Sequence, residues 1–238
     1  GYIQSIVSSE VTEFQSRYRK TASLPVDLEL RSRFNQALDK SWFGAVTQVI
    51  NAITMLSIIL TGAALIRERE HGTIEHLLVM PVTPLEIMVS KVWSMGLVVL
   101  LASSVALTFV VQGLLGVPIQ GSLALFMLGA ALHLFATASM GIFLATVAGS
   151  MPQFGLLLMM VLIPLQILSG AVTPRESMPG IIQEIMQVAP NTHFVALAQS
   201  VLFRGAGLDV VWPQLAALLG IGAVLFMLAL RRFRQFLQ

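Results

Sequence analysis

The 238-residue sequence contains no cysteine and few charged residues. The lack of cysteine excludes disulfides and thiolate metal sites within these residues. Only 11% of the residues are charged and 56% are hydrophobic, whereas a typical soluble domain has about 25% charged residues. A soluble fold could not bury so much apolar surface and still present a wettable exterior. The composition therefore indicates an integral membrane protein.

The uncharged residues are concentrated in one part of the chain. No Asp, Glu, Lys or Arg occurs from Val92 to Pro174, where His133 is the single residue that could titrate. Hydrocarbon offers no partner to an unpaired backbone amide, so membrane spans of about 20 apolar residues must be helical. We expect an all-α helical bundle with five spans, at residues 44–66, 92–115, 122–148, 154–171 and 214–230.

The first 41 residues have a different composition and hold 11 of the 26 charged residues. Apolar residues recur at helical spacing from Ile3 to Tyr18, and they alternate with charged residues from Val26 to Arg31. These patterns predict an amphipathic helix and a strand. We expect residues 1–41 to be the tail of an extracytoplasmic α/β domain, followed by a transmembrane domain at 42–238.

The orientation follows from the basic residues in short connections, which favour the cytoplasmic side. These residues lie between the first two spans and after the last one, at Arg67, Arg69, Lys91, Arg231, Arg232 and Arg234. We therefore expect segment 67–91 and the C-terminus in the cytoplasm, and residues 1–41 and loop 172–213 outside. An upstream helix with a cytoplasmic N-terminus would complete a six-span unit.

The segment between the first two spans is unusually rich in charge, with Arg-Glu-Arg-Glu-His-Gly starting at Arg67. Gly72 is suited to ending the first span, and Thr73 to capping a short helix that Pro81 terminates. The apolar residues up to Leu78 would share one face of this helix. The residues alone leave two interpretations open, an ordinary charged loop with an interfacial helix or a docking element for a partner.

The run from Arg67 to Leu78, followed by Pro-Val-Thr-Pro and by Lys91, resembles the cytoplasmic signature of type-2 ABC exporter permeases. The stretches Leu168–Pro179 and Pro190–Gly205 are similar to that family's external loop before its last span. Val26–Asn35 resembles the end of the external domain in the bacterial drug-exporter branch. One position departs from the pattern, since Ser90 stands where the family usually has glycine.

This resemblance implies a six-span permease of the bacterial inner membrane that pairs with itself or with a sister subunit. ATP and Mg would bind to a separate ATPase subunit, so this chain would carry no cofactor, and a periplasmic adaptor protein could extend the path outward. The helix near residues 72–80 would be the coupling helix that docks on the ATPase. The residues expected to contact the ATPase or hold this helix are Glu68, Glu70, Gly72, Thr73, Glu75 and Leu78.

Polar side chains form a stripe on the first span, because Thr47, Asn51, Thr54, Ser57 and Thr61 fall within about a third of the helical circumference. One interpretation is hydrogen bonding between helices. The other follows from the resemblance, in which the matching span lines the substrate path at the dimer seam. On that interpretation we expect the path at Thr47, Asn51, Thr54 and, on the fourth span, Gln166.

Other functional classes find less support in the sequence. His133 and Ser139 share one span, but no acidic residue accompanies them, so we expect His133 to make a hydrogen bond within the bundle rather than to act in catalysis. A carrier driven by an ion gradient usually needs ionisable groups inside the bundle. A net charge of +2 gives no basis for nucleic-acid binding.

The expected function is therefore export of a lipophilic or drug-like substrate by a permease that has no catalytic site of its own. A passive membrane scaffold or channel is the alternative, and an intramembrane enzyme is the least favoured.

Overall fold

The computed structural model describes residues 6–7, 9–11, 13–14, 40–72, 81–173 and 175–236. The described residues before position 15 are helical, in agreement with part of the expected amphipathic helix. The strand expected near residues 26–31 and the segment 73–80 lie outside the described residues. Residues 1–38 and 39–238 form two separate compact units, and the second unit holds the apolar spans.

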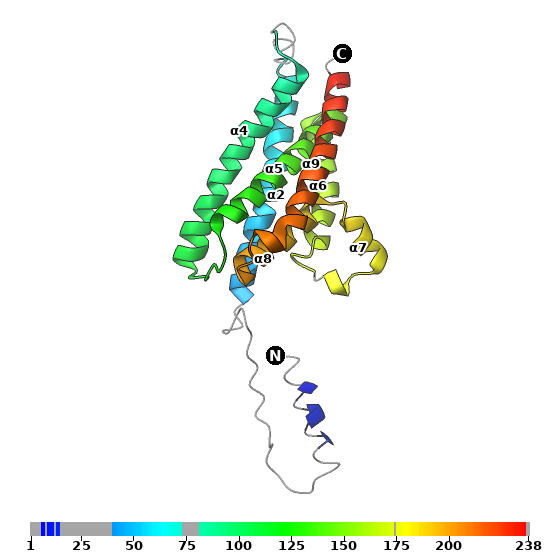
Figure 1. Ribbon diagram of the computed structural model, residues 1–238. Coiled ribbons are helices and arrows are strands. Elements are labelled where there is room, and N and C mark those ends of the chain that lie inside the picture. Colours follow the sequence, from blue (N-terminus) through cyan, green and yellow to red (C-terminus); the bar gives the residue numbers. More distant parts are fainter. Residues whose placement is uncertain are drawn as a thin grey trace. The chain divides into compact units, whose positions relative to one another are not determined.

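The second unit is built from helices, which follow one another in the order shown in Figure 1. They are α2 (Lys40–Glu70), α4 (Pro84–Val105), the π-helix η1 (Ala106–Leu114), α5 (Leu123–Val147), α6 (Met151–Leu168), the 3-10 turn η2 (Arg175–Ser177), α7 (Gly180–Met186), α8 (Pro190–Arg204) and α9 (Leu208–Phe236). Five of the described helical segments are long and apolar enough to cross a membrane. The prediction of an all-α membrane bundle with five spans is confirmed.

The two ends of this bundle differ in what they carry (Figure 1). At the end that we call the Gly72 end, α2 and α9 terminate, α4 begins, and a short turn joins α5 to α6. The opposite end, which we call the α8 end, carries α7 and α8 between the last two membrane-spanning helices.

Helix α4 begins at Pro84, whereas the hydropathy pattern predicts a span only from residue 92. The backbone amide of Glu86 donates to Thr83 Oγ1 at 3.3 Å, and the amide of Thr83 donates to Glu86 Oε2 at 2.7 Å. This reciprocal capping box satisfies two amides that the first turn would leave unpaired. Pro84 at the first helical position supplies a backbone angle suited to a helix start.

Helix α5 lies in the centre of the bundle, where it contacts α2, α4, α6, α8 and α9 (Figure 1). Buried residues recur along its length, from Phe126 near the α8 end to Thr146 near the Gly72 end. Small residues on α5 allow the neighbouring backbones to come close. At Gly141, an added Cβ would lie 2.6 Å from the backbone oxygen of Ile58 on α2 and would also meet Thr61 Oγ1. The glycine therefore sets the spacing between α2 and α5.

We predict that Gly141→Ala destabilises the protein by about 1–3 kcal/mol, because the methyl group has no space against the backbone of α2. The measurement is the midpoint of thermal unfolding of the full-length protein in detergent. Gly155→Ala on α6 is the matched control, since nothing lies within 4 Å of an added Cβ there. Equal midpoints for the two variants would contradict the close α2–α5 approach.

Candidate functional site

The last turn of α2 contains a polar cluster, Glu68, Arg69 and Glu70, that reaches three other parts of the Gly72 end. Glu68 forms an ion pair with Lys91 of α4. Arg69 Nη1 donates to the backbone oxygen of Ala148 at 3.1 Å, at the end of α5. Glu70 Oε1 accepts the backbone N–H of Met151 at 3.0 Å, at the start of α6. The cluster therefore connects the end of α2 to α4 and to the α5–α6 turn.

Gly72 follows this cluster and ends the helical path of α2. Its φ of +69° is in the left-handed region that favours glycine, and its amide donates to the oxygen of Arg69 at 3.1 Å. Of the residues expected to meet an ATPase, Glu68, Glu70 and Gly72 lie together here. Thr73, Glu75 and Leu78 are outside the described residues. The role of all six toward an ATPase stays a prediction.

A second polar group lies inside the bundle, where Thr54 of α2, His133 of α5 and Asn191 of α8 meet. All three residues have an exposed fraction of 0%. Thr54 Oγ1 lies 2.8 Å from Asn191 Oδ1 and 2.9 Å from His133 Nε2. Asn191 Nδ2 donates to the backbone oxygen of Leu165 on α6 at 2.9 Å. This buried triad therefore links four helices.

The backbone oxygen of Leu165 can only accept a hydrogen bond, and this determines which atoms of the triad are donors. The oxygen of Leu165 accepts, so the amide nitrogen of Asn191 faces it and the amide oxygen faces Thr54. Thr54 has one hydroxyl hydrogen, and Asn191 Oδ1 at 2.8 Å is a nearer acceptor for it than the oxygen of Ile50 in the same helix at 3.1 Å. This leaves Nε2 of His133 as the donor toward Thr54. The expectation that His133 makes a hydrogen bond within the bundle is confirmed. Its ring also stacks on Phe194, with centroids 4.3 Å apart.

The rest of the polar stripe on α2 continues toward the Gly72 end. Thr137 Oγ1 of α5 donates to Ser57 Oγ at 2.8 Å, and Thr61 Oγ1 lies 3.3 Å from the oxygen of Ala138. Ser57 and Thr61 are buried. Thr61 Oγ1 also donates to the oxygen of Ser57 in its own helix at 2.7 Å, so Ser57 carries the short hydrogen bond between α2 and α5 in this part of the stripe.

The four residues expected on a substrate path do not form one cluster in the structure. Thr54 lies in the buried triad, Thr47 is buried, and Asn51 and Gln166 are half-buried. Among the described residues, the buried Oδ1 atom of Asn51 has no hydrogen-bond partner. In this respect Asn51 differs from Thr54, whose hydroxyl is hydrogen-bonded to two side chains. The assignment of these four residues to a substrate path stays a prediction.

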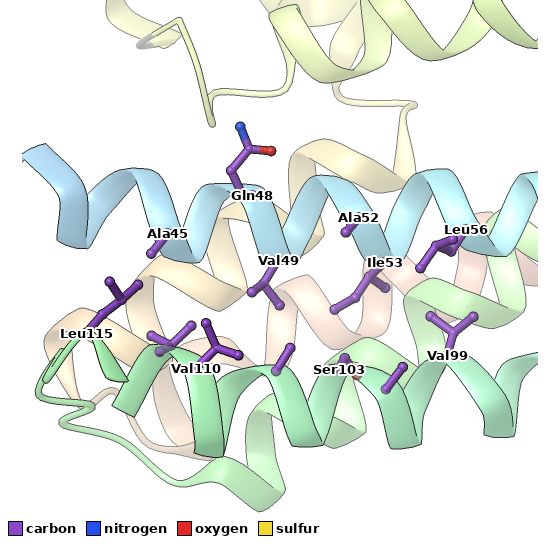
Figure 2. A pocket seen from close by; sticks show the side chains of 13 residues that line it. Ala45, Gln48, Val49, Ala52, Ile53, Leu56, Val99, Ser103, Val110 and Leu115 are labelled. Atoms are coloured by element: carbon purple, nitrogen blue, oxygen red, sulfur yellow. The ribbon is translucent and has the colours of Figure 1, made fainter. Parts of the chain in front are cut away.

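An apolar groove of about 430 Å³ runs between α2 and the continuous helix formed by α4 and η1 (Figure 2). Figure 2 shows Val49 and Ile53 of α2 facing Val99 and Val110 across it, while Gln48 points away from α4. Alanines on both sides leave the space open, namely Ala45, Ala52, Ala102 and Ala106. Hydropathy and helical spacing do not reveal this groove, because it depends on how α2 packs against α4 and η1.

The π-helix η1 forms part of the groove wall and was not expected from the sequence. The amide of Leu115 donates to the oxygen of Val110 at 3.0 Å, five residues earlier, which is the spacing of a π-helix. π-Helical turns are rare and are often found at functional sites. Here η1 extends over nine residues, directly after α4.

The membrane-spanning helices, with a polar cluster at one end and a buried polar triad between them, define a multi-pass membrane protein. Comparison with known proteins gives the family. Residues 16–203 match the ABC-2 type transporter family, and the chain belongs to it.

The relatives include named bacterial permeases. The chain is 61% identical over 235 residues to the inner membrane transport permease YhhJ of Escherichia coli (strain K12), covering 99% of this chain and 63% of the relative. It is 29% identical over 236 residues to the probable multidrug ABC transporter permease YbhR of the same strain, again covering 99% and 63%. The chain thus spans somewhat less than two thirds of these relatives.

We predict that Thr54→Val destabilises the protein by about 1–2 kcal/mol, because the methyl group leaves Asn191 and His133 without their buried partner. Thermal unfolding of the full-length protein in detergent measures this. Thr146→Val is the control, since its buried hydroxyl bonds to the oxygen of Phe143 in its own helix, at 2.7 Å. If both substitutions lowered the midpoint equally, the triad would have no special role in joining the helices.

Proposed function

We propose that this permease subunit exports a lipophilic or drug-like compound across the bacterial inner membrane, with energy from ATP hydrolysed on a separate ABC ATPase subunit. The observation that carries the proposal is the polar cluster at the end of α2, which leads through Gly72 into the segment that resembles an ATPase-coupling signature. The names of the relatives, an inner membrane transport permease and a probable multidrug ABC transporter permease, support the same function.

The charge distribution also supports ATP as the energy source. The uncharged stretch from Val92 to Pro174 covers η1, α5, α6 and most of α4. Carriers driven by ion gradients usually hold the coupling ion with ionisable groups inside the bundle. An apolar interior of this kind also suits a lipophilic cargo better than a small ion.

The proposed orientation places the Gly72 end in the cytoplasm. Arg67, Arg69 and Lys91 lie at this end, as do the basic residues at the end of α9, and basic residues accumulate on the cytoplasmic side of bacterial membrane proteins. The α8 end and residues 1–41 then face the periplasm. In this orientation segment 73–80 is accessible to a cytoplasmic ATPase, and a periplasmic adaptor would meet the α8 end.

The mechanism is alternating access in a pair of permease subunits, which are two copies of this protein or this protein and a sister subunit. Closure of the ATPase pair on Mg-ATP would favour one of two conformations of the membrane helices, as any ligand favours the state that it binds more tightly. The coupling segment passes this preference to α2. The membrane helices then change from an inward-open to an outward-open arrangement.

Asn51 is the residue of α2 best suited to meet the cargo. It is half-buried, and its Oδ1 atom has no partner among the described residues. An unpaired polar atom in a membrane is unfavourable, so a hydrogen-bond donor on the cargo or on the second subunit would stabilise it. Thr47, one helical turn away, and Gln166 of α6 are proposed as further contacts along the path.

The first test is whether an ABC ATPase associates with the full-length protein and responds to lipophilic compounds. We expect the two subunits to co-purify and the compounds to stimulate hydrolysis. Gly72→Val should lower this stimulation several-fold, because a β-branched residue is strained at a φ of +69°.

The control for this test is Gly220→Val on α9, where nothing lies within 4 Å of an added Cβ. It should leave the stimulation unchanged. Failure of the ATPase to associate would contradict the proposed function and bring the scaffold or channel interpretation forward.

The second test addresses Asn51. We expect Asn51→Leu to raise the compound concentration that gives half-maximal stimulation by about fivefold, which corresponds to one lost hydrogen bond of about 1 kcal/mol. Gln48→Leu is the matched control, since it removes an amide from an exposed side chain of the same helix. Equal effects of the two substitutions would exclude a specific contact at Asn51.

A further inference from the structure

The turn between α5 and α6 is short, and side chains of α2 make hydrogen bonds at both of its ends. Helix α5 ends at Val147 and α6 begins at Met151, which leaves Ala148, Gly149 and Ser150 between them. The backbone of Ala148 is extended, with a ψ of 135°. Ser150, at the N-cap of α6, makes no capping hydrogen bond with its side chain. The first amide of α6 therefore depends on a partner from another element.

Helix α2 supplies that partner. The carboxylate of Glu70 accepts the amide of Met151 at 3.0 Å, and the adjacent Arg69 donates to the oxygen of Ala148 at 3.1 Å. A negative charge thus lies at the N-terminus of α6 and a positive charge at the C-terminus of α5, each facing the helix end of opposite partial charge. Hydrogen bonds to charged groups are roughly twice as strong as neutral ones.

These two side chains lie next to the proposed coupling segment. Only His71 and Gly72 separate Glu70 from residue 73. Helical geometry continues up to this point, because the amide of His71 donates to the oxygen of Arg67 at 3.0 Å. A displacement of segment 73–80 therefore acts on Glu70 through a very short piece of backbone.

Helix α6 contacts the rest of the subunit through one apolar face and through polar contacts near its two ends. Its buried residues, Phe154, Leu158, Leu162 and Leu165, share one face. Near its other end, the oxygen of Leu165 accepts the amide of Asn191. Polar contacts thus hold α6 near both ends, and a single apolar face packs on the bundle between them.

We infer that Arg69 and Glu70 are positioning residues that carry the movement of the coupling segment to α6 through the α5–α6 turn. The inference rests on the proposed function, since it assumes that an ATPase moves segment 73–80. It assigns a second transmission path beside α2 itself. The path reaches the helix that carries Gln166, one of the residues proposed to meet the cargo.

The test uses the full-length permease and its ATPase in lipid nanodiscs. Glu70→Ala and Arg69→Ala remove the two contacts, while Glu70→Gln and Arg69→Lys preserve an acceptor and a donor. Arg231→Ala is the control, because it removes an exposed positive charge in the last part of α9 at the same end of the bundle. The readouts are ATPase co-purification, basal hydrolysis, compound-stimulated hydrolysis and the spectrum of a nitroxide attached at Leu156→Cys, an exposed position on α6.

We expect the ratio of compound-stimulated to basal hydrolysis to fall about tenfold in both alanine variants, in line with the loss of one charge-assisted hydrogen bond. They should also lose the change that ATP causes in the nitroxide spectrum. Glu70→Gln and Arg69→Lys should retain more than half of the stimulation, and Arg231→Ala all of it. A merely structural role would lower the basal and the stimulated rates together.

The inference is overturned if Glu70→Ala keeps both the stimulation and the nitroxide response. If Gly72→Val uncouples hydrolysis while Glu70→Ala does not, the path through the α5–α6 turn is wrong and the proposed function stands. If no ATPase co-purifies with the unaltered protein, the proposed function itself fails and this inference fails with it.

Discussion

The hydrogen bonds at the hydroxyl of Thr54 are the interaction on which the arrangement of the helices depends. Hydrocarbon cannot satisfy polar side chains, so the buried amide of Asn191 and the ring of His133 need partners within the protein. Thr54 serves both. The triad thereby fixes the first turn of α8 against α2 and α5, and through Asn191 it also holds α6. If α2 moves relative to α5, either these hydrogen bonds break or α5 and α8 move together with α2.

The triad and the polar cluster at the Gly72 end both connect α2 to other helices, but at different points along α2. The cluster joins the end of α2 to α4 and to the α5–α6 turn, whereas the triad joins the middle of α2 to α5, α6 and α8. Between them α2 contacts α5 through the hydrogen bond at Ser57, the close approach at Gly141 and apolar side chains.

The membrane spans and the polar stripe on α2 could be predicted from the sequence, but the contacts between the helices could not. The five spans are visible because hydropathy is a local property, and the stripe containing Thr54 is visible because helical spacing is local too. The side-chain partners of Thr54 are 79 and 137 residues away, so only the fold brings them together. The same holds for the contact between Glu70 and Met151, 81 residues apart. The early start of α4 had a local signal, Thr83 followed three residues later by Glu86, which hydropathy alone overlooked.

A transport measurement tests the proposed ATP-driven export most directly. The full-length permease and its ATPase would be reconstituted into proteoliposomes with the ATPase sites facing outward, and uptake of a fluorescent lipophilic compound would be measured. If the protein exports its cargo with energy from ATP, uptake requires Mg-ATP, is absent with a non-hydrolysable analogue, and is insensitive to a collapsed proton gradient. ATP hydrolysis without compound movement, or movement that follows the proton gradient without ATP, would contradict it.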